Sequence, residues 1–322
     1  MEQSVIGQKI KTQIDKAKNV LVIAHQQPDA DCLGSMVAVC DWLSSQNTKH
    51  VKFCLDQPPQ NLSWLVNFEP VSDTTDELLK EQFDTVVVLD SGDLKYAGVD
   101  EVVPKLSGKP VVINIDHHAT NQGFGDINLV DENAVSTTLI LYELFKSLNF
   151  KISRQAASAM LAGIIFDTYN FTNPNTNKRA MEVAARLLSA GASLPHVSDS
   201  ILKTKSIDSL KIWGQILIRL RYNPHFGMAT TVITSDDLKD GVTKAEVTEG
   251  VANFLNNLAG AKAALILQQQ DDMVKGSLRT NDDSVDVSKF ARMFGGGGHK
   301  KASGFKVKGR LVEDENGHWQ IK

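Results

Sequence analysis

The sequence has few cysteines, no long apolar run and no excess of positive charge, the features typical of secreted, membrane-spanning and duplex-DNA-binding proteins respectively. It contains only three cysteines, and no two of them form a Cys-x-x-Cys pair. This favours buried free thiols in a reducing cytoplasm over a disulfide framework. No apolar run reaches the length of a membrane span, and residues 1–19 lack the apolar core of a secretory signal. The net charge is −4, so no large positive field predicts long duplex DNA or an anionic membrane as a partner.

The composition that remains is that of an ordinary globular protein. Hydrophobic residues make up 42% of the chain and charged residues 22%, which is enough to bury a core. A length of 322 residues predicts two domains. A small phosphorylated substrate is compatible with the negative net charge, because metal ions can supply positive charge locally.

The stretch from Val20 to Ser35, VLVIAH followed by QQPDADCLGS, organises the rest of the chain. A short apolar run that ends sharply is typical of a buried parallel strand. His25, Asp29 and Asp31 follow it directly and precede a helical segment, at the edge where open α/β sheets bind ligands. Two carboxylates in one loop repel each other unless a cation lies between them. A helix cap plus a turn is the alternative interpretation.

The first two thirds of the chain alternate apolar strands with amphipathic helices. Further strands are expected at 51–56, 83–93 and 110–118, and helices at 32–45, 134–148, 153–167, 178–188 and 206–222. Repeated strand–helix units with short connections predict an α/β fold with a doubly wound, mostly parallel sheet.

The pattern changes at Asn223-Pro224, which we take as the domain boundary. The predicted organisation is a domain at 1–195, a helical linker at 196–224 and a smaller α+β domain at 225–322. In the last domain we expect strands at 226–234, 264–270, 273–280 and 305–310, a helix face from Val247 to Leu258, a helix at 286–294 and a glycine loop at 295–298.

Residues of metal-ligand type follow three separate strands. They are His25, Asp29 and Asp31 after the first, Asp90 after the next, and Asp116, His117 and His118 after the last, with Asp167 beyond the following helices. The ends of parallel strands meet at one edge, so these residues can assemble. Imidazole and carboxylate ligands without thiolate suit Mn²⁺ better than a structural Zn²⁺, with Mg²⁺, Co²⁺ or Fe²⁺ as alternatives. Two histidines and four aspartates from this set would make six ligands, which are too many for one ion and predict two, the usual device for hydrolysing phosphate esters.

Five segments in this order carry a family resemblance: HQQPDADCLGS, VVVLDSGD, NIDHH, GIIFDT and GGGGHKKASGF. Together they resemble the DHH phosphoesterase superfamily with its DHH-associated C-terminal domain. The resemblance implies that His25 and Asp29 hold one Mn²⁺, that Asp31, His117 and Asp167 hold the other, and that Asp90 bridges the two. It also implies that His118 faces the substrate phosphate and that Asp116 orients the neighbouring histidines, a role for Asp116 that we favour over direct ligation.

The same resemblance implies substrate contacts in the C-terminal domain, at Arg279, His299 and the glycines Gly296, Gly297 and Gly298. Consecutive backbone N–H groups beside His299-Lys300-Lys301 make an anion cradle, although a flexible linker is the alternative. Ser136 is a further candidate at a helix N-terminus, where a cap is the simpler interpretation. The chain departs from the family pattern at Gln27, Tyr169-Asn170, Thr172 and Ser303, and the changes near Asp167 bear on substrate preference.

These observations predict a cytoplasmic, Mn²⁺-dependent phosphodiesterase or phosphatase that acts on short oligonucleotides, on phosphoadenosine phosphate (pAp), or on both. A cyclic di-AMP or pApA phosphodiesterase is the alternative substrate assignment. A pyrophosphatase and a non-catalytic nucleotide-binding module are weaker alternatives, since the latter predicts broken ligand motifs or a basic surface. The expected partner is a short oligonucleotide or small nucleotide, without long duplex nucleic acid or membrane, and a homodimer is the oligomer considered.

Overall fold

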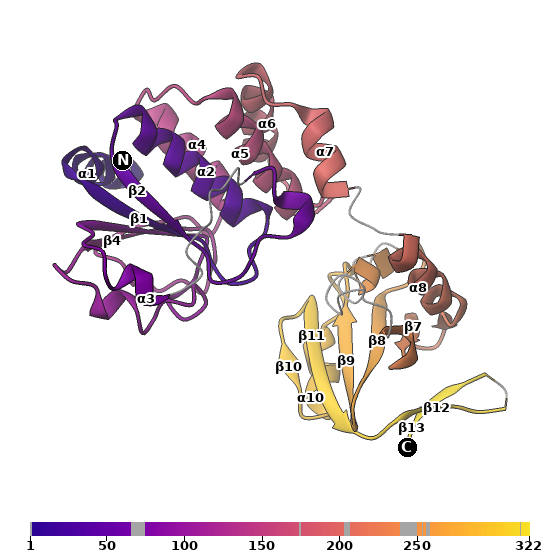
Figure 1. The fold of residues 1–322 in the computed structure, drawn as a ribbon. Coiled ribbons are helices and arrows are strands. Elements are labelled where there is room, and N and C mark those ends of the chain that lie inside the picture. The colour runs from indigo at the N-terminus through magenta and orange to yellow at the C-terminus, as the bar shows by residue number, and fades with distance from the viewer. Residues whose placement is uncertain are drawn as a thin grey trace. The chain divides into compact units, whose positions relative to one another are not determined.

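The computed structural model describes residues 2–65, 75–173, 175–202, 207–238, 250–252, 254–255, 258–315 and 317–322. The chain divides into two compact units, Met1–Thr204 and Lys205–Lys322 (Figure 1). No helix within these ranges is long and apolar enough to cross a membrane.

The first unit is built on a five-stranded parallel sheet. Its strands are β1 (Asn19–Ile23), β2 (Lys49–Phe53), β3 (Thr85–Leu89), β4 (Val111–Asp116) and β5 (Ile127–Val130), in the order β2-β1-β3-β4-β5. All four neighbouring pairs are parallel, which confirms the predicted sheet. The strand order reverses between β1 and β3, and doubly wound sheets bind their ligands outside the carboxyl ends of the strands at such a switch point.

Alternating strand residues supply a core on each face of the sheet. Val20 and Val22 of β1 lie in one core with residues of the helices, whereas Leu21 and Ile23 lie in the other with residues 97–106. The helices are α1 (Glu2–Lys16), α2 (Ala30–Ser45), α3 (Thr75–Leu78), α4 (Thr137–Ser147), α5 (Arg154–Asp167), α6 (Lys178–Ser189) and α7 (Leu194–Leu202), with short 3₁₀ turns η1 (Gln60–Leu62) and η2 (Val103–Lys105). Helices α2, α4 and α5 pack against one another and contribute to the same core as Val20 and Val22 (Figure 1).

The second unit is a six-stranded mixed sheet with helices. Its order is β10-β11-β9-β8-β7-β6, with β7 and β8 parallel and the other pairs antiparallel. The elements are α8 (Ile207–Ile218), β6 (Arg221–Asn223), β7 (Met228–Ile233), η3 (Asp236–Leu238), β8 (Ala263–Gln270), β9 (Met273–Arg279), α10 (Val287–Met293), β10 (Gly297–Gly298), β11 (Ala302–Lys308), β12 (Leu311–Glu313) and β13 (Trp319–Ile321). The last two strands form a separate hairpin.

Several details differ from the sequence expectations. One helix is expected over 206–222, but the helix ends at Ile218. Arg221–Asn223 forms strand β6, which pairs with β7. Within the stretch 196–224, Val197 of α7 lies in the core of the first unit and Ile216 of α8 lies in a core of the second. Strands β5, β12 and β13 were not predicted, and β11 begins before the expected strand. Residues 247–249, 253, 256 and 257 of the expected helix face lie outside the described residues.

Candidate active site

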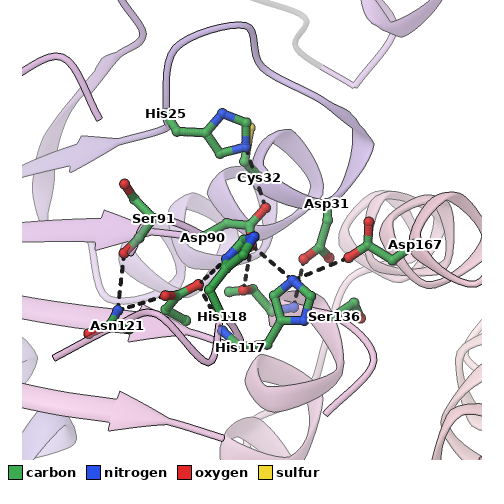
Figure 2. Close-up of polar contacts among 12 residues, drawn as sticks. His25, Asp31, Cys32, Asp90, Ser91, His117, His118, Asn121, Ser136 and Asp167 are labelled. Carbon is green, nitrogen blue, oxygen red and sulfur yellow. Dashed lines mark hydrogen bonds and ion pairs between the residues drawn. The ribbon is translucent and has the colours of Figure 1, made fainter. Parts of the chain in front are cut away.

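The predicted ligands come together at the carboxyl edge of the parallel sheet. His25 follows β1, Asp90 follows β3, and His117 and His118 follow β4, and these three strands are direct neighbours in the sheet. Figure 2 shows their side chains converging with those of Asp31 and Asp167.

Asp29 uses its two oxygens for different purposes. Oδ1 accepts hydrogen bonds from the backbone N–H groups of Asp31 (2.9 Å) and Cys32 (3.0 Å), which caps α2. Oδ2 lies 3.9 Å from Nε2 of His25. The helix cap and the metal ligand, which the sequence offered as alternatives, are therefore compatible in one side chain.

Asp90 stands between two groups of ligands. Its Oδ2 lies 3.5 Å from Nε2 of His25, and its Oδ1 lies 3.5 Å from Nε2 of His117. The side chain is buried, and Thr137 Oγ1 donates a hydrogen bond of 2.9 Å to Oδ1. The backbone of Asp90 is left-handed (φ 55°), a strained conformation that turns the chain sharply at the end of β3. This arrangement gives each carboxylate oxygen a different imidazole neighbour, as a bridging ligand requires.

Hydrogen bonds at Nδ1 set the orientation of His25 and His117, the two histidines predicted to be ligands. Nδ1 of His25 lies 2.6 Å from the carbonyl oxygen of Gln26, and Nδ1 of His117 lies 3.3 Å from that of Ala134. A ring nitrogen that faces a carbonyl oxygen must carry the proton, so Nε2 is left in each ring as the atom that could bind a metal ion.

Asp31 and Asp167 complete a second group with His117. Asp31 accepts hydrogen bonds from the backbone N–H groups of Thr137 (2.6 Å) and Thr138 (3.0 Å), at the N-terminus of α4. Oδ2 of Asp167 lies 3.5 Å from Nε2 of His117 and is buried without a hydrogen-bond partner in the described part of the chain. A buried carboxylate oxygen of this kind is costly unless a cation or donor satisfies it.

Gly163 makes room for this group. A Cβ atom at that position of α5 would lie 2.4 Å from Oδ1 of Asp31 and 2.6 Å from Oγ1 of Thr138. Any larger residue would push α5 away from the Asp31 carboxylate and would displace Asp167, which ends the same helix.

The carboxylates of the candidate site repel one another electrostatically. Burial raises the pKa of Asp31 and of Asp167 well above the usual range, and neighbouring carboxylates add to the effect. Burial would also raise the pKa of Asp90, but the hydrogen bond with His25 and the charge of His117 outweigh it and lower the pKa. Burial lowers the pKa of His25, yet the hydrogen bond to Asp90 and its charge prevail and raise it to about 9. Divalent cations relieve repulsion of this kind, and the oxygen and imidazole donors fit such ions.

His118 is held differently from His25 and His117. Its Nδ1 donates to Oδ1 of Asp116 over 2.8 Å, and the ring is half exposed. The hydrogen bond to Asp116 raises the pKa of His118, even though burial opposes it. Asp116 also accepts from the backbone N–H of His117 (2.8 Å) and from Nδ2 of Asn121 (2.6 Å), so it orients this loop without facing the other carboxylates.

Two regions of the chain match the domains of one known protein family. The N-terminal domain of the DHH family matches residues 19–164, and the DHHA1 domain matches residues 228–316. The chain belongs to the DHH phosphoesterase superfamily. This membership confirms the expectation of a phosphodiester hydrolase.

Individual relatives of this DHH protein cover most of its length. It is 28% identical over 293 residues to a bifunctional oligoribonuclease and PAP phosphatase NrnA of Thermus thermophilus, covering 90% of this chain and 84% of the relative. The crystal structure of an exopolyphosphatase-related protein from Bacteroides fragilis has a TM-score of 0.84 at 23% identity, covering 95% of this chain and 92% of that one. RecJ of Thermus thermophilus in complex with Mn²⁺ has a TM-score of 0.54 at 16% identity, covering 95% and 52%. The two structures establish the likeness of fold.

The predicted substrate residues of the DHHA1 domain lie close together within the second unit. Arg279 of β9 is the register partner of Ala302 of β11, and the backbone N–H of His299 donates to the carbonyl oxygen of Ala302. A Cβ atom on Gly296 would lie 2.2 Å from the carbonyl oxygen of Gly304, and Gly298 has a φ of 133°. The glycine run is therefore a structure packed against β11, with Gly297 and Gly298 as strand β10, and the flexible linker is excluded for these residues.

Two residues near the DHH site have structural explanations. Ser136 is fully buried, and its Oγ accepts the backbone N–H of Leu139 as the cap of α4, so the simpler interpretation accounts for its side chain. Cys32 lies close enough to His25 and Asp29 to join a metal group, but burial raises the pKa of its thiol well above the usual range.

Sequence reasoning missed several residues that shape the site. Asn121 connects Asp116 to the carbonyl oxygen of Ser91 (3.1 Å), and so links the loops after β4 and β3. Thr138 donates a hydrogen bond to Asp31, and Thr137, which the sequence indicated only as part of a helix start, donates one to Asp90. Tyr96 packs against His25 with ring centroids 4.9 Å apart. The two threonines stand at a recognisable helix start, but nothing local in the sequence connects Tyr96 to His25.

Proposed function

We propose that this chain hydrolyses short oligoribonucleotides and pAp, using two divalent ions of which Mn²⁺ is the first candidate. The observation that carries the proposal is Asp90, whose two oxygens each face a different imidazole. The activity named for the Thermus thermophilus relative supports the choice of substrate, and the Mn²⁺ complex of RecJ supports the choice of metal.

The donor atoms divide into two sets around Asp90. His25 and Asp29 would hold one ion, and Asp31, His117 and Asp167 would hold the other. Two bound ions supply a nucleophilic water at neutral pH and neutralise charge on the phosphate. The unpartnered oxygen of Asp167 is a ligand position that the described protein leaves unsatisfied, and Nε2 of His25 and of His117 each face a carboxylate oxygen of Asp90 across 3.5 Å.

His118 is the residue proposed to act on the substrate. Asp116 accepts a hydrogen bond from Nδ1–H and raises the pKa of the ring, which favours the doubly protonated form. In that form, Nε2–H donates a hydrogen bond to a phosphate oxygen and stabilises the charge that develops there. The same proton can pass to the leaving oxygen.

The second unit is proposed to bind the part of the nucleotide that does not react. Arg279 offers a planar guanidinium that pairs with phosphate, and the packed glycine loop beside His299 offers backbone N–H groups. This division of roles favours short substrates with a second phosphate or base over small artificial diesters.

The decisive experiment is turnover of the full chain loaded with Mn²⁺. Ribodinucleotides, pAp, pApA, cyclic di-AMP and pyrophosphate are supplied separately, and the products are resolved by chromatography. We expect mononucleotides from the ribodinucleotides and AMP from pAp. Preferred hydrolysis of cyclic di-AMP or pApA would move the assignment to the alternative phosphodiesterase, and turnover of pyrophosphate alone would overturn it.

A further inference from the structure

A cleft of about 550 Å³ adjoins the metal ligands on the side of α5 and the loop that follows it. His117, His118 and Asp167 form one wall, so whatever occupies the cleft lies next to the scissile phosphate. The other wall is built by Glu132 and Asn133 before α4 and by residues 173, 175 and 176 after α5. This volume falls within the usual range for small-molecule sites, roughly 300–1,000 Å³.

The residues that line the cleft disfavour two parts of a nucleotide, a second phosphate and a base. No lysine or arginine is among the described residues of the cleft, and Glu132 adds a negative charge, so a second phosphate is disfavoured. The nearby Arg179 is occupied by Asp131 (2.8 Å) and Glu143 (2.7 Å). Apart from the two histidines of the site, the described lining has no aromatic ring on which a base would stack.

What the cleft offers is a group of neutral and anionic hydrogen-bonding side chains. Asn173 is used internally, because it contacts the carbonyl oxygen of Asp167 and the backbone N–H of Asn175. Oγ1 of Thr176 is buried and has no hydrogen-bond partner within the described chain. Glu132 and Asn175 are exposed at the wall. Carboxylates, amides and hydroxyls are the partners of sugar hydroxyl groups, as in the acidic residue that binds ribose in dinucleotide folds.

We propose that this cleft binds the ribose next to the scissile phosphate through its hydroxyl groups, with Glu132 as the principal acceptor, and thereby distinguishes ribonucleotides from deoxyribonucleotides. The inference rests on the proposed function, because it assumes a nucleotide at the metal site. It goes further by naming the sugar as a determinant of specificity, since only the 2′-hydroxyl separates the two substrate classes.

The test is calorimetric binding to the full Mn²⁺-loaded chain, with AMP and 2′-deoxy-AMP as probes. We expect AMP to bind about ten- to hundredfold more tightly than 2′-deoxy-AMP, because one hydrogen bond to a charged acceptor contributes a difference of this size. Glu132→Ala should remove most of that preference, and Asn175→Ala should reduce it. Glu182→Ala is the matched control, because this carboxylate is exposed on α6 and pairs only with Lys178 among its described ion pairs.

Equal binding of the two probes to the unsubstituted chain would overturn the ribose site, as would a preference that persists in Glu132→Ala. Failure of the proposed function has a different signature. In that case the preference for AMP remains and depends on Glu132, while ribodinucleotides and pAp are not hydrolysed.

Discussion

Replacing Asp90 with asparagine tests the two-metal arrangement most directly. The substitution removes one charge from the only carboxylate that faces both His25 and His117 among the described residues. One ion would then keep only His25 and Asp29, whereas the other would keep Asp31, His117 and Asp167. A dinuclear site that loses its bridging carboxylate holds one of its ions less tightly. We therefore expect the Asp90→Asn protein to retain about one equivalent of Mn²⁺ after dialysis, whereas the parent protein retains about two.

The fold should tolerate this substitution. Asparagine is among the residues that accept a left-handed backbone such as that of Asp90, and its amide oxygen can accept the hydrogen bond from Thr137. The charge of Asp90 also raises the pKa of Asp31, so its removal relieves repulsion in the metal-free protein. The thermal unfolding midpoint without metal should change little above pH 9, where His25 is neutral, and should fall at lower pH, where the substitution removes the charged partner of His25.

Activity should fall much further than stability. Loss of several kcal/mol of transition-state stabilisation corresponds to about a thousandfold or more in kcat. Elemental analysis and turnover of a ribodinucleotide and of bis-p-nitrophenyl phosphate measure both effects. Asp93→Asn is the control, because this exposed residue lies in the same loop and contacts the backbone N–H of Tyr96. An Asp90→Asn protein with two bound ions and turnover within about tenfold of the parent would refute the bridging role.

Three further predictions concern the other residues. His118→Ala should keep both metal equivalents and lose about a hundredfold or more in kcat, as removal of a general acid does, whereas loss of one equivalent would make His118 a ligand. Arg279→Ala should lower kcat/KM for a ribodinucleotide by about ten- to hundredfold while hydrolysis of bis-p-nitrophenyl phosphate hardly changes, and equal loss on both substrates would place Arg279 in the chemical step. When a chelator keeps the protein free of metal, protonated His25 stabilises the folded state, because its pKa is about 9 when folded and 6.5 when unfolded. This stabilisation is fully present below pH 6.5 and is lost as the pH rises through about 9. The unfolding midpoint should therefore decline over this range, less so in His25→Asn, and an equal decline in both proteins would contradict the pKa assignment.

The sequence predicted the elements that carry an unambiguous apolar pattern. Strands β1, β3 and β4 are continuous runs that end in a ligand, and this pattern alone indicated that His25, Asp90 and His117 share an edge. Strand β5 has only four residues, three of them half-buried, so its pattern is weak. The amphipathic pattern continues past Ile218, but pairing with β7 overrides it at Arg221–Asn223.

The parts of the site that sequence could not supply depend on contacts between distant elements. Gly163 matters because Asp31 comes from another helix, and no local rule connects those two positions. The left-handed residues Tyr169, Asn170 and Phe171 turn the chain after Asp167, although none of them is glycine. Their conformation follows from the packing of this turn, which local propensity does not predict.

The burial of all three cysteines has a practical consequence. Cys32, Cys40 and Cys54 are buried in the first unit, and burial raises the pKa of Cys40 to about 12 and that of Cys54 to about 11. Few thiolates exist at neutral pH under these conditions, so maleimide dyes should leave the native protein almost unlabelled. One exposed cysteine introduced into each unit would then take up the dyes selectively.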